Sequence, residues 1–340
     1  MKILFIGNRE KHGYSFYQYK ILKKIYKTVE ILEIKNLNKT LSFINSIIWK
    51  YNNSIFDHMI MLKLKSTIKK NYDLIYVHNE SLLGNKSIIF LKTKAKKIFY
   101  YCPDNPFVAR DNKRWELIKN NFSLFDLIIF MQKNRFRYAK KLGLNKTIWI
   151  PPTFKIKEQK RLKNNYQDYK KYSSDVVLIA TCFPEREKLI EKLIKEKINI
   201  KIYGDRWNKS NLFGKYKNYF GSKISNDLLY VKLIQYSKIA ICLPSYENDD
   251  DITNRSLEIP YIGTFLLAKK TKTHQETFVN NKEAVLFNNF NDCVKKINYF
   301  LRNKKQRIQI AKNGQKKILQ NKKYFSFEEN IKKIISSYLI

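Results

Sequence analysis

Short apolar runs alternate along the chain with longer stretches in which apolar residues recur every three or four positions. In the first half these runs include KILFI, DLIYV and FDLIIF, and in the second half DVVLIA, INIKIYG and KIAICL. Continuous apolar runs of this length are typical of parallel strands that are covered by helices on both faces. The alternation therefore predicts an α/β fold built from successive βα units.

A change in this pattern divides the chain. The stretch that follows Pro151 and Pro152 is polar and charged, and the alternation restarts only at DVVLIA. Because the 340 residues are about twice the usual domain size, two domains with separate cores are expected. We predict a Rossmann-like domain over residues 1–152, a linker over 153–174, a second Rossmann-like domain over 175–324 and a closing helix over 325–340.

The charge of the chain adds candidate partners to this picture. Lys and Arg number 67 against 29 Asp and Glu, which gives a formal net charge of +38. Such a charge attracts nucleic acid, anionic lipid head groups and phosphorylated substrates. The lysines are spread along the whole chain rather than gathered in one arm, which favours a compositional bias over a specific nucleic-acid site. An anionic membrane surface stays a candidate partner.

The cysteines and the apolar segments bear on the compartment. Cys102, Cys182, Cys242 and Cys293 lie far apart and form no CxxC pair, so neither a zinc site nor a disulfide framework is indicated. The apolar run at the start is too short for a signal peptide, and no segment approaches the apolar length of a membrane span. We expect a cytoplasmic protein that sits at the inner face of the membrane if its charge binds lipid.

Three loops of the first half are candidate ligand sites, because ligands of open parallel sheets bind beyond the carboxyl ends of the strands. The first loop, GNREKHGYS, contains His12 but no GxGxxG fingerprint. His78 ends the run DLIYV and suits either a catalytic base or a structural role. Asp104 lies between two prolines in YCPDNPF, where it either contacts a ligand or caps its own loop.

The stretch NDDDITNRSLEIPYIGTFLLAKK is the richest in candidate chemistry. Three aspartates precede Asn254, Arg255 and Glu258, and an apolar strand pattern follows Gly263. The spacing of Arg255 and Glu258 places both on one side of the opening turns of a helix, where backbone N–H groups favour phosphate. The pair is equally compatible with an intrahelical ion pair worth a few tenths of a kcal/mol. Clustered aspartates suit Mg²⁺, but we interpret them chiefly as loop and N-cap residues.

From Asp175 onward the chain resembles the CgeB-like (spore-maturation-protein) glycosyltransferases. The resemblance rests on the order of FPEREKLIEKL, INIKIYGDRW, YSKIAICLPS, DITNRSLEIPYIGTFLLA, FVNNKEAVLFNNFNDCVKKINYFLRN and RIQIAKNGQKKIL. These pieces cover essentially all of the second half. The first half matches only loosely, apart from PDNPF.

The resemblance implies a GT-B fold, in which two Rossmann-like domains face each other across a cleft. It implies a metal-independent hexosyltransferase without a cofactor, which takes its sugar from a nucleotide-diphosphate donor bound by the second domain. The acceptor, a glycan, a lipid-linked molecule or a protein, would bind to the first domain, and the closing helix would pack back on that domain.

The resemblance also implies roles for residues of the second domain. Arg255 looks like the residue that neutralises the donor phosphate, and Glu258 looks like the acceptor of the ribose hydroxyls. A guanidinium fork matches phosphate oxygens, and a carboxylate accepts the paired donors of a diol. Thr253, Asn254 and Gly204 complete the expected donor site.

The chain departs from the family after its first C-terminal strand, where relatives tend to have glycine. No glycine lies between Asp175 and Gly204. Arg186 either supplies a phosphate contact in place of the glycine loop or lies on a helix surface.

The catalytic base and the class of protein stay open. If the enzyme inverts the anomeric carbon, Asp104, His78 or His12 would deprotonate the acceptor, and if it retains the configuration no such base is needed. The alternatives to a glycosyltransferase are a basic nucleic-acid-binding protein and an inactive GT-B-shaped binding protein.

Overall fold

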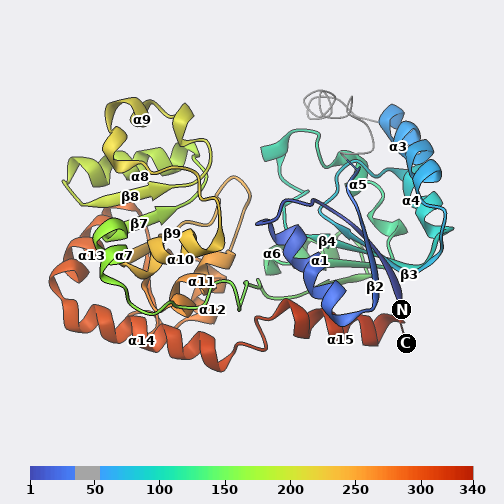
Figure 1. The fold of residues 1–340 in the computed structure, drawn as a ribbon. Helices are drawn as coiled ribbons and strands as arrows, with labels where there is room; N and C mark the ends of the chain where they lie inside the picture. The colour runs from blue at the N-terminus through green and yellow to red at the C-terminus, as the bar shows by residue number, and fades with distance from the viewer. Residues whose placement is uncertain (35–53, 340) are drawn as a thin grey trace. The chain divides into compact units, whose positions relative to one another are not determined.

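The chain forms two compact units in the computed structural model, which describes residues 1–34 and 54–339 (Figure 1). Unit 1 comprises Met1–Pro151, Ser245–Asp250 and Phe327–Ile340, and unit 2 comprises Pro152–Pro244 and Asp251–Ser326. The segment Ser245–Asp250 therefore belongs to unit 1, although both its neighbours in sequence belong to unit 2.

Unit 1 is built on a parallel sheet with the strand order β2-β1-β3-β4-β5-β6. Its strands are β1 (Lys2–Ile6), β2 (Thr28–Leu32), β3 (Tyr72–His78), β4 (Ala95–Cys102), β5 (Leu127–Phe130) and β6 (Thr147–Trp149). Its described helices are α1 (Tyr14–Ile25), α3 (Ser54–Thr67), α4 (Asn85–Lys92), α5 (Glu116–Lys119), α6 (Lys133–Lys141) and α15 (Phe327–Leu339).

The apolar strands of unit 1 are buried on both faces because successive side chains point to opposite sides. Phe5 and Tyr76 face the cluster that is covered by α1 and α15 (Figure 1). Ile6 and Val77 face the cluster to which α3 and α4 contribute. Phe327, at the start of α15, is fully buried and lies edge-on to Tyr76 with ring centroids 6.4 Å apart. The closing helix is thus part of the core of unit 1.

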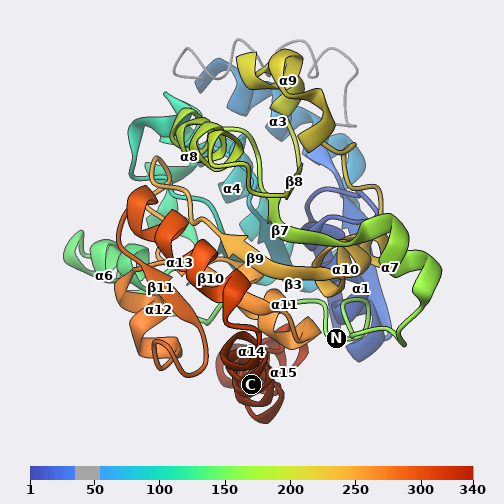
Figure 2. The ribbon, with the colours of Figure 1, turned by 90° about the vertical axis from the view of Figure 1, so that its left-hand side faces the viewer.

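Unit 2 has a second parallel sheet, with the order β11-β10-β9-β7-β8. The strands are β7 (Ser174–Ile179), β8 (Ile200–Tyr203), β9 (Ser237–Cys242), β10 (Phe265–Lys269) and β11 (Val285–Phe287). The helices are α7 (Tyr166–Tyr172), α8 (Pro184–Lys195), α9 (Asn211–Lys215), α10 (Asp227–Gln235), α11 (Asn254–Ile262), α12 (Lys272–Thr277), α13 (Phe290–Arg302) and α14 (Lys304–Gln320). Helices α8 and α13 pack on one face of the sheet (Figure 2), and α10 and α11 pack on the other.

Residues 153–174, which we predicted as a linker, are grouped with unit 2. Phe154 is fully buried in its core, and Lys155 Nζ pairs with Asp227 Oδ1 at 2.9 Å. Further along, the backbone N–H of Leu162 donates to the side chain of Gln235 at 2.8 Å. Most side chains of the segment are polar because it lies along the surface of unit 2, where only a few of them are buried.

Candidate functional site

Helix α11 has Arg255 and Glu258 in its first two turns, and Thr253 is its N-cap. The backbone N–H of Thr253 donates to Ser256 Oγ at 3.2 Å, which forms one half of a capping box. This corrects the interpretation of the preceding aspartates as N-cap residues, because a cap must stand directly before the first helical residue. Gly263 ends the helix with φ of 91°, a left-handed conformation that suits glycine.

A fully buried histidine holds the start of α11 in place. His274 Nδ1 lies 2.7 Å from the carbonyl oxygen of Lys269, which can only accept, so Nδ1 carries the proton. Its Nε2 then accepts from Ser256 Oγ at 2.7 Å. Cys242 Sγ at the end of β9 lies 3.3 Å from the same hydroxyl. The first turn of α11 is therefore tied to both neighbouring strands.

Glu258 lies in the interior of unit 2 rather than at an open surface, with only 3% of the residue exposed. One carboxylate oxygen accepts from Gln159 Nε2 at 3.0 Å, and the other accepts from the Tyr230 hydroxyl. Burial raises the pKa of Tyr230 well above its ordinary value, and the Glu258 charge raises it further, so the phenol stays a donor. Contact between Glu258 and a ribose would require one of these partners to move.

Arg255 is half-buried one turn before Glu258, and its charge opposes the rise in the pKa of Tyr230. It lines a cavity of about 10 Å³ together with apolar side chains that include Ile179 and Ile259. A cavity of that volume holds about one water molecule. Arg255 and Glu258 therefore lie about one turn apart on α11, and the cavity that Arg255 lines has no room for a nucleotide.

Arg186 and Gly204 occupy structural positions at the carboxyl ends of strands. Arg186 is buried, and its guanidinium donates to the carbonyl oxygens of Thr181 at 2.8 Å and Leu243 at 2.9 Å. Gly204 has φ of 128°, and a Cβ there would lie 2.2 Å from the carbonyl oxygen of Ala180. Arg186 thus ties the loop after β7 to the end of β9, and neither position presents an open phosphate contact in this structure.

The three base candidates of unit 1 differ in environment. His12 is exposed. The His78 ring stacks on Tyr101, and its Nε2 is buried without a hydrogen-bond partner among the described residues. Burial lowers the pKa of His78 to about 4, so the ring is neutral at pH 7. Asp104 is half-buried and accepts from Asn79 Nδ2 at 2.8 Å, with Arg110 Nη2 3.6 Å away.

The segment Ser245–Asp250 is fixed on unit 1 by contacts that sequence reasoning missed. The Arg135 side chain, 1% exposed, pairs with Asp250 and also donates to the carbonyl oxygen of Asn248 at 3.0 Å. Burial raises the pKa of Asp250, and the Arg135 charge opposes that rise. Asn105 donates two hydrogen bonds to Asn248, from its backbone N–H to Oδ1 at 3.2 Å and from its Nδ2 to the carbonyl oxygen at 3.1 Å. The sequence marked the aspartates, but nothing near Arg135 distinguishes it from the many other basic residues.

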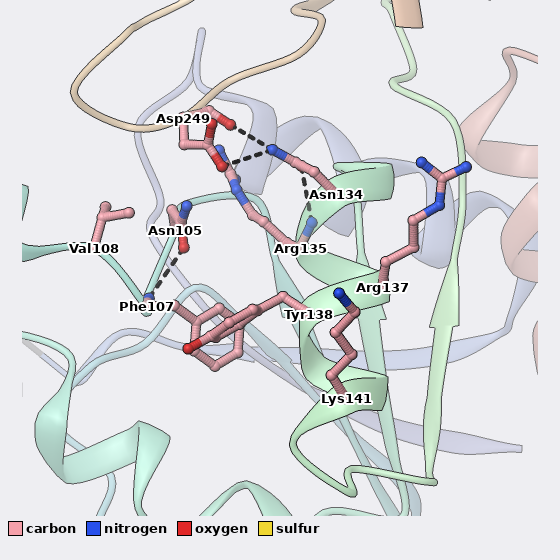
Figure 3. A pocket seen from close by; sticks show the side chains of 9 residues that line it. All are labelled: Asn105, Phe107, Val108, Asn134, Arg135, Arg137, Tyr138, Lys141 and Asp249. Carbon is pink, nitrogen blue, oxygen red and sulfur yellow. Dashed lines mark hydrogen bonds between the residues drawn. The ribbon is translucent and has the colours of Figure 1, made fainter. Parts of the chain in front are cut away.

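A pocket of about 470 Å³ lies beside this segment and is lined entirely by unit 1 (Figure 3). Asn134, Arg137, Tyr138 and Lys141 line it from α6, together with the buried Arg135. Asn105, Phe107 and Val108 line it from the loop after β4, and Asp249 from the fixed segment. Asn134 Nδ2 donates to the Asp249 carboxylate at 2.8 Å. The volume lies within the range of small-molecule sites.

Within residues 1–34 and 54–339, no group of three or more His, Cys, Asp or Glu side chains is arranged to hold a metal ion. None of the helices in these ranges is both long and apolar enough to cross a membrane.

Residues 186–334 match the model of a protein family that is described as glycosyl transferase-like. A comparison with functionally curated proteins finds no significant match. Among solved structures, Anabaena HepE in complex with UDP-glucose is 15% identical, with a TM-score of 0.70 over 99% of this chain and 100% of that one. Sucrose-phosphate synthase from Thermosynechococcus elongatus is 13% identical, with a TM-score of 0.72 over 99% and 98%.

A glycosyltransferase from Rickettsia africae is 14% identical, with a TM-score of 0.65 over 99% of this chain and 97% of that one. At these identities the likeness shows the fold. The predicted GT-B fold, with two Rossmann-like units, is confirmed. The family match covers α11 and with it Arg255 and Glu258.

Proposed function

We propose that this protein is a glycosyltransferase that moves a sugar from a nucleotide-diphosphate donor to an acceptor. The observation that carries the proposal is the glycosyl transferase-like match over residues 186–334, together with the place of α11 within it. Helix α11 follows β9, so its N-terminus lies at the carboxyl edge of a parallel sheet, where α/β proteins bind nucleotides. A donor diphosphate there would meet the positive end of the helix dipole.

Arg255 is the proposed phosphate ligand. Its guanidinium starts from the first turn of α11, so a change of side-chain rotamer could carry it from the cavity beside Tyr230 to a bound diphosphate. Negative charge grows on the departing diphosphate in the transition state, and a guanidinium at that point stabilises it. In other enzymes a metal ion stabilises this charge, and we propose that no metal is needed here.

Glu258 is proposed as the ribose ligand only in a donor-bound form in which Gln159 or Tyr230 gives up its hydrogen bond. In the structure as it stands, the pair of hydrogen bonds makes Glu258 the anchor of α11 to the interior.

Asp104 is the proposed base if the reaction inverts the anomeric carbon. Of the three candidates it alone combines partial exposure with a carboxylate held in place by a side-chain donor, Asn79. His78 would first have to turn its buried Nε2 outward.

The direct test is a thermal-shift screen of UDP, GDP and their sugar conjugates, followed by measurement of nucleotide release with and without EDTA. A ligand at a hundred times its Kd should add about 2.7 kcal/mol to the stability of the folded state. We expect one nucleotide family to stabilise the protein and EDTA to leave the rate unchanged. If no nucleotide or nucleotide sugar shifts the melting curve, the proposed function is wrong.

A further inference from the structure

The pocket on α6 combines an aromatic platform with two exposed cationic side chains, in addition to the buried Arg135 (Figure 3). Phe107 and Tyr138 meet with ring centroids 5.1 Å apart and an interplanar angle of 64°. Phe107 also packs against Phe122 and Phe130, so the platform rests on the core of unit 1. Tyr138 is 49% exposed, which leaves one of its sides open to a ligand. The ring faces of aromatic side chains suit the C–H faces of a pyranose.

The cationic side chains are Arg137 and Lys141, which follow each other by one turn on α6. Both are exposed, and neither has an ion-pair partner among the described residues. The one acidic residue that lines the pocket, Asp249, is occupied by Asn134 Nδ2 at 2.8 Å. Like charges at this spacing destabilise a helix by a few tenths of a kcal/mol. An anion bound between them would remove that repulsion.

The aromatic rings and the charged ends of the two exposed cations lie apart from one another in Figure 3. In Figure 3 the rings of Phe107 and Tyr138 lie toward the left, and the charged ends of Arg137 and Lys141 lie to their right. The volume of about 470 Å³ has room for a mono- or disaccharide. A ligand that fills the pocket would therefore present an apolar ring face on one side and negative charge on the other.

We propose that this pocket binds an anionic sugar, a uronic acid or a sugar phosphate, as the acceptor or the acceptor's terminal residue. This inference rests on the proposed function only where it makes the sugar an acceptor, since binding itself needs no catalysis. It assigns a substrate class to the acceptor and names Arg137, Tyr138 and Lys141 as the residues that select it.

The test measures binding without a donor, so that it stands apart from the test of glycosyl transfer. The probes are D-glucuronate, glucose 6-phosphate, D-glucose and inorganic phosphate, each titrated against the full chain by ligand-observed NMR and calorimetry. We expect both anionic sugars to bind about fivefold more tightly than glucose, because one exposed ion pair contributes up to about that factor. Inorganic phosphate should bind more weakly than glucose 6-phosphate, because it lacks the ring face.

Variants then assign the effect to residues. Arg137→Gln and Lys141→Gln should each weaken the anionic sugars about fivefold and leave glucose unchanged. Tyr138→Ala should weaken all three sugars and leave inorganic phosphate unchanged. Lys140→Gln is the matched control, because it removes the same charge from the same helix, but Lys140 lies outside the pocket and its Nζ donates to Asn145. It should bind every probe as the wild type does.

Four outcomes would overturn the inference: no binding of either anionic sugar, equal affinity for glucose and glucuronate, phosphate binding as tight as that of glucose 6-phosphate, or equal losses in Lys140→Gln and Arg137→Gln. The donor screen reads out separately. Sugar binding without any nucleotide response would remove the proposed function and keep the pocket as a sugar site. A nucleotide response without sugar binding would keep the proposed function and remove the pocket as a sugar site.

Discussion

Replacing His274 should loosen the start of the helix that carries Arg255. The His274 ring is fully buried, and its two nitrogens bridge Lys269 and Ser256 at 2.7 Å each. Ser256 is also the partner of Thr253 in the capping box of α11. A substitution that removes the ring leaves a buried carbonyl and a buried hydroxyl with one partner fewer. Each such loss costs about 1–3 kcal/mol, so a total of about 2–6 kcal/mol is expected.

The lowered pKa of His274 determines how the effect of the substitution changes with pH. Burial lowers the pKa of His274 from 6.5 to about 4. In the unfolded chain the ring takes up a proton near pH 6.5, whereas in the folded chain it does so only near pH 4. The neutral ring therefore contributes stability that is present above pH 6.5 and is lost as the pH falls through 4. The difference between the two pKa values corresponds to about 3 kcal/mol.

The assay compares the wild type with His274→Gln in urea melts between pH 4 and pH 8. The variant should be less stable at pH 7, and the gap in the free energy of unfolding should shrink by about 3 kcal/mol toward pH 4. His78, whose pKa is lowered in the same way, is present in both proteins and cancels in the difference. Hydrogen exchange should show faster exchange of the α11 amides in the variant at pH 7.

The matched control is His58→Gln, because His58 is exposed on α3. Its stability should differ little from that of the wild type at pH 7, because the substitution removes no buried group. If His274→Gln loses the same stability at every pH from 4 to 8, the ring is not held neutral in the folded protein and the reasoning is refuted.

Three further predictions concern the proposed site and the closing helix. Arg255→Ala should lower kcat/KM for the donor by about tenfold to a hundredfold and should also lower kcat. Arg255→Lys should restore kcat/KM only in part. Wild-type kinetics in both variants would place the donor phosphate elsewhere. Asp104→Asn should lower kcat while the nucleotide-induced thermal shift stays unchanged; an unchanged kcat would exclude Asp104 as the base. Phe327→Ala should destabilise unit 1 by about 3–5 kcal/mol in a thermal or urea melt, because the ring is fully buried against Tyr76 and Tyr101; unaltered stability would show that α15 does not contribute to that core.

Local sequence determined the elements and much of the fold. The apolar runs became the strands of two parallel sheets, and α11 begins beside Thr253 and ends at Gly263. These features depend on side-chain alternation and on caps, which are settled by residues within a few positions of one another. The resemblance of the second half pointed to the GT-B fold, which the structural comparisons confirm.

The tertiary structure decided which polar side chains are open and which are occupied. Glu258 is bound by Gln159, which lies 99 positions earlier in the chain, and Arg135 pairs with Asp250 across 115 positions. Arg135 lies in a basic helix of a basic chain. The sequence around it does not distinguish a buried ion-pair partner from an exposed basic residue. Because the partner of a buried charge is chosen by which elements the fold brings together, no local pattern specifies it. The pocket on α6 arises in the same way, since its lining comes from a helix, a loop after β4 and a segment that lies about a hundred residues further along the chain.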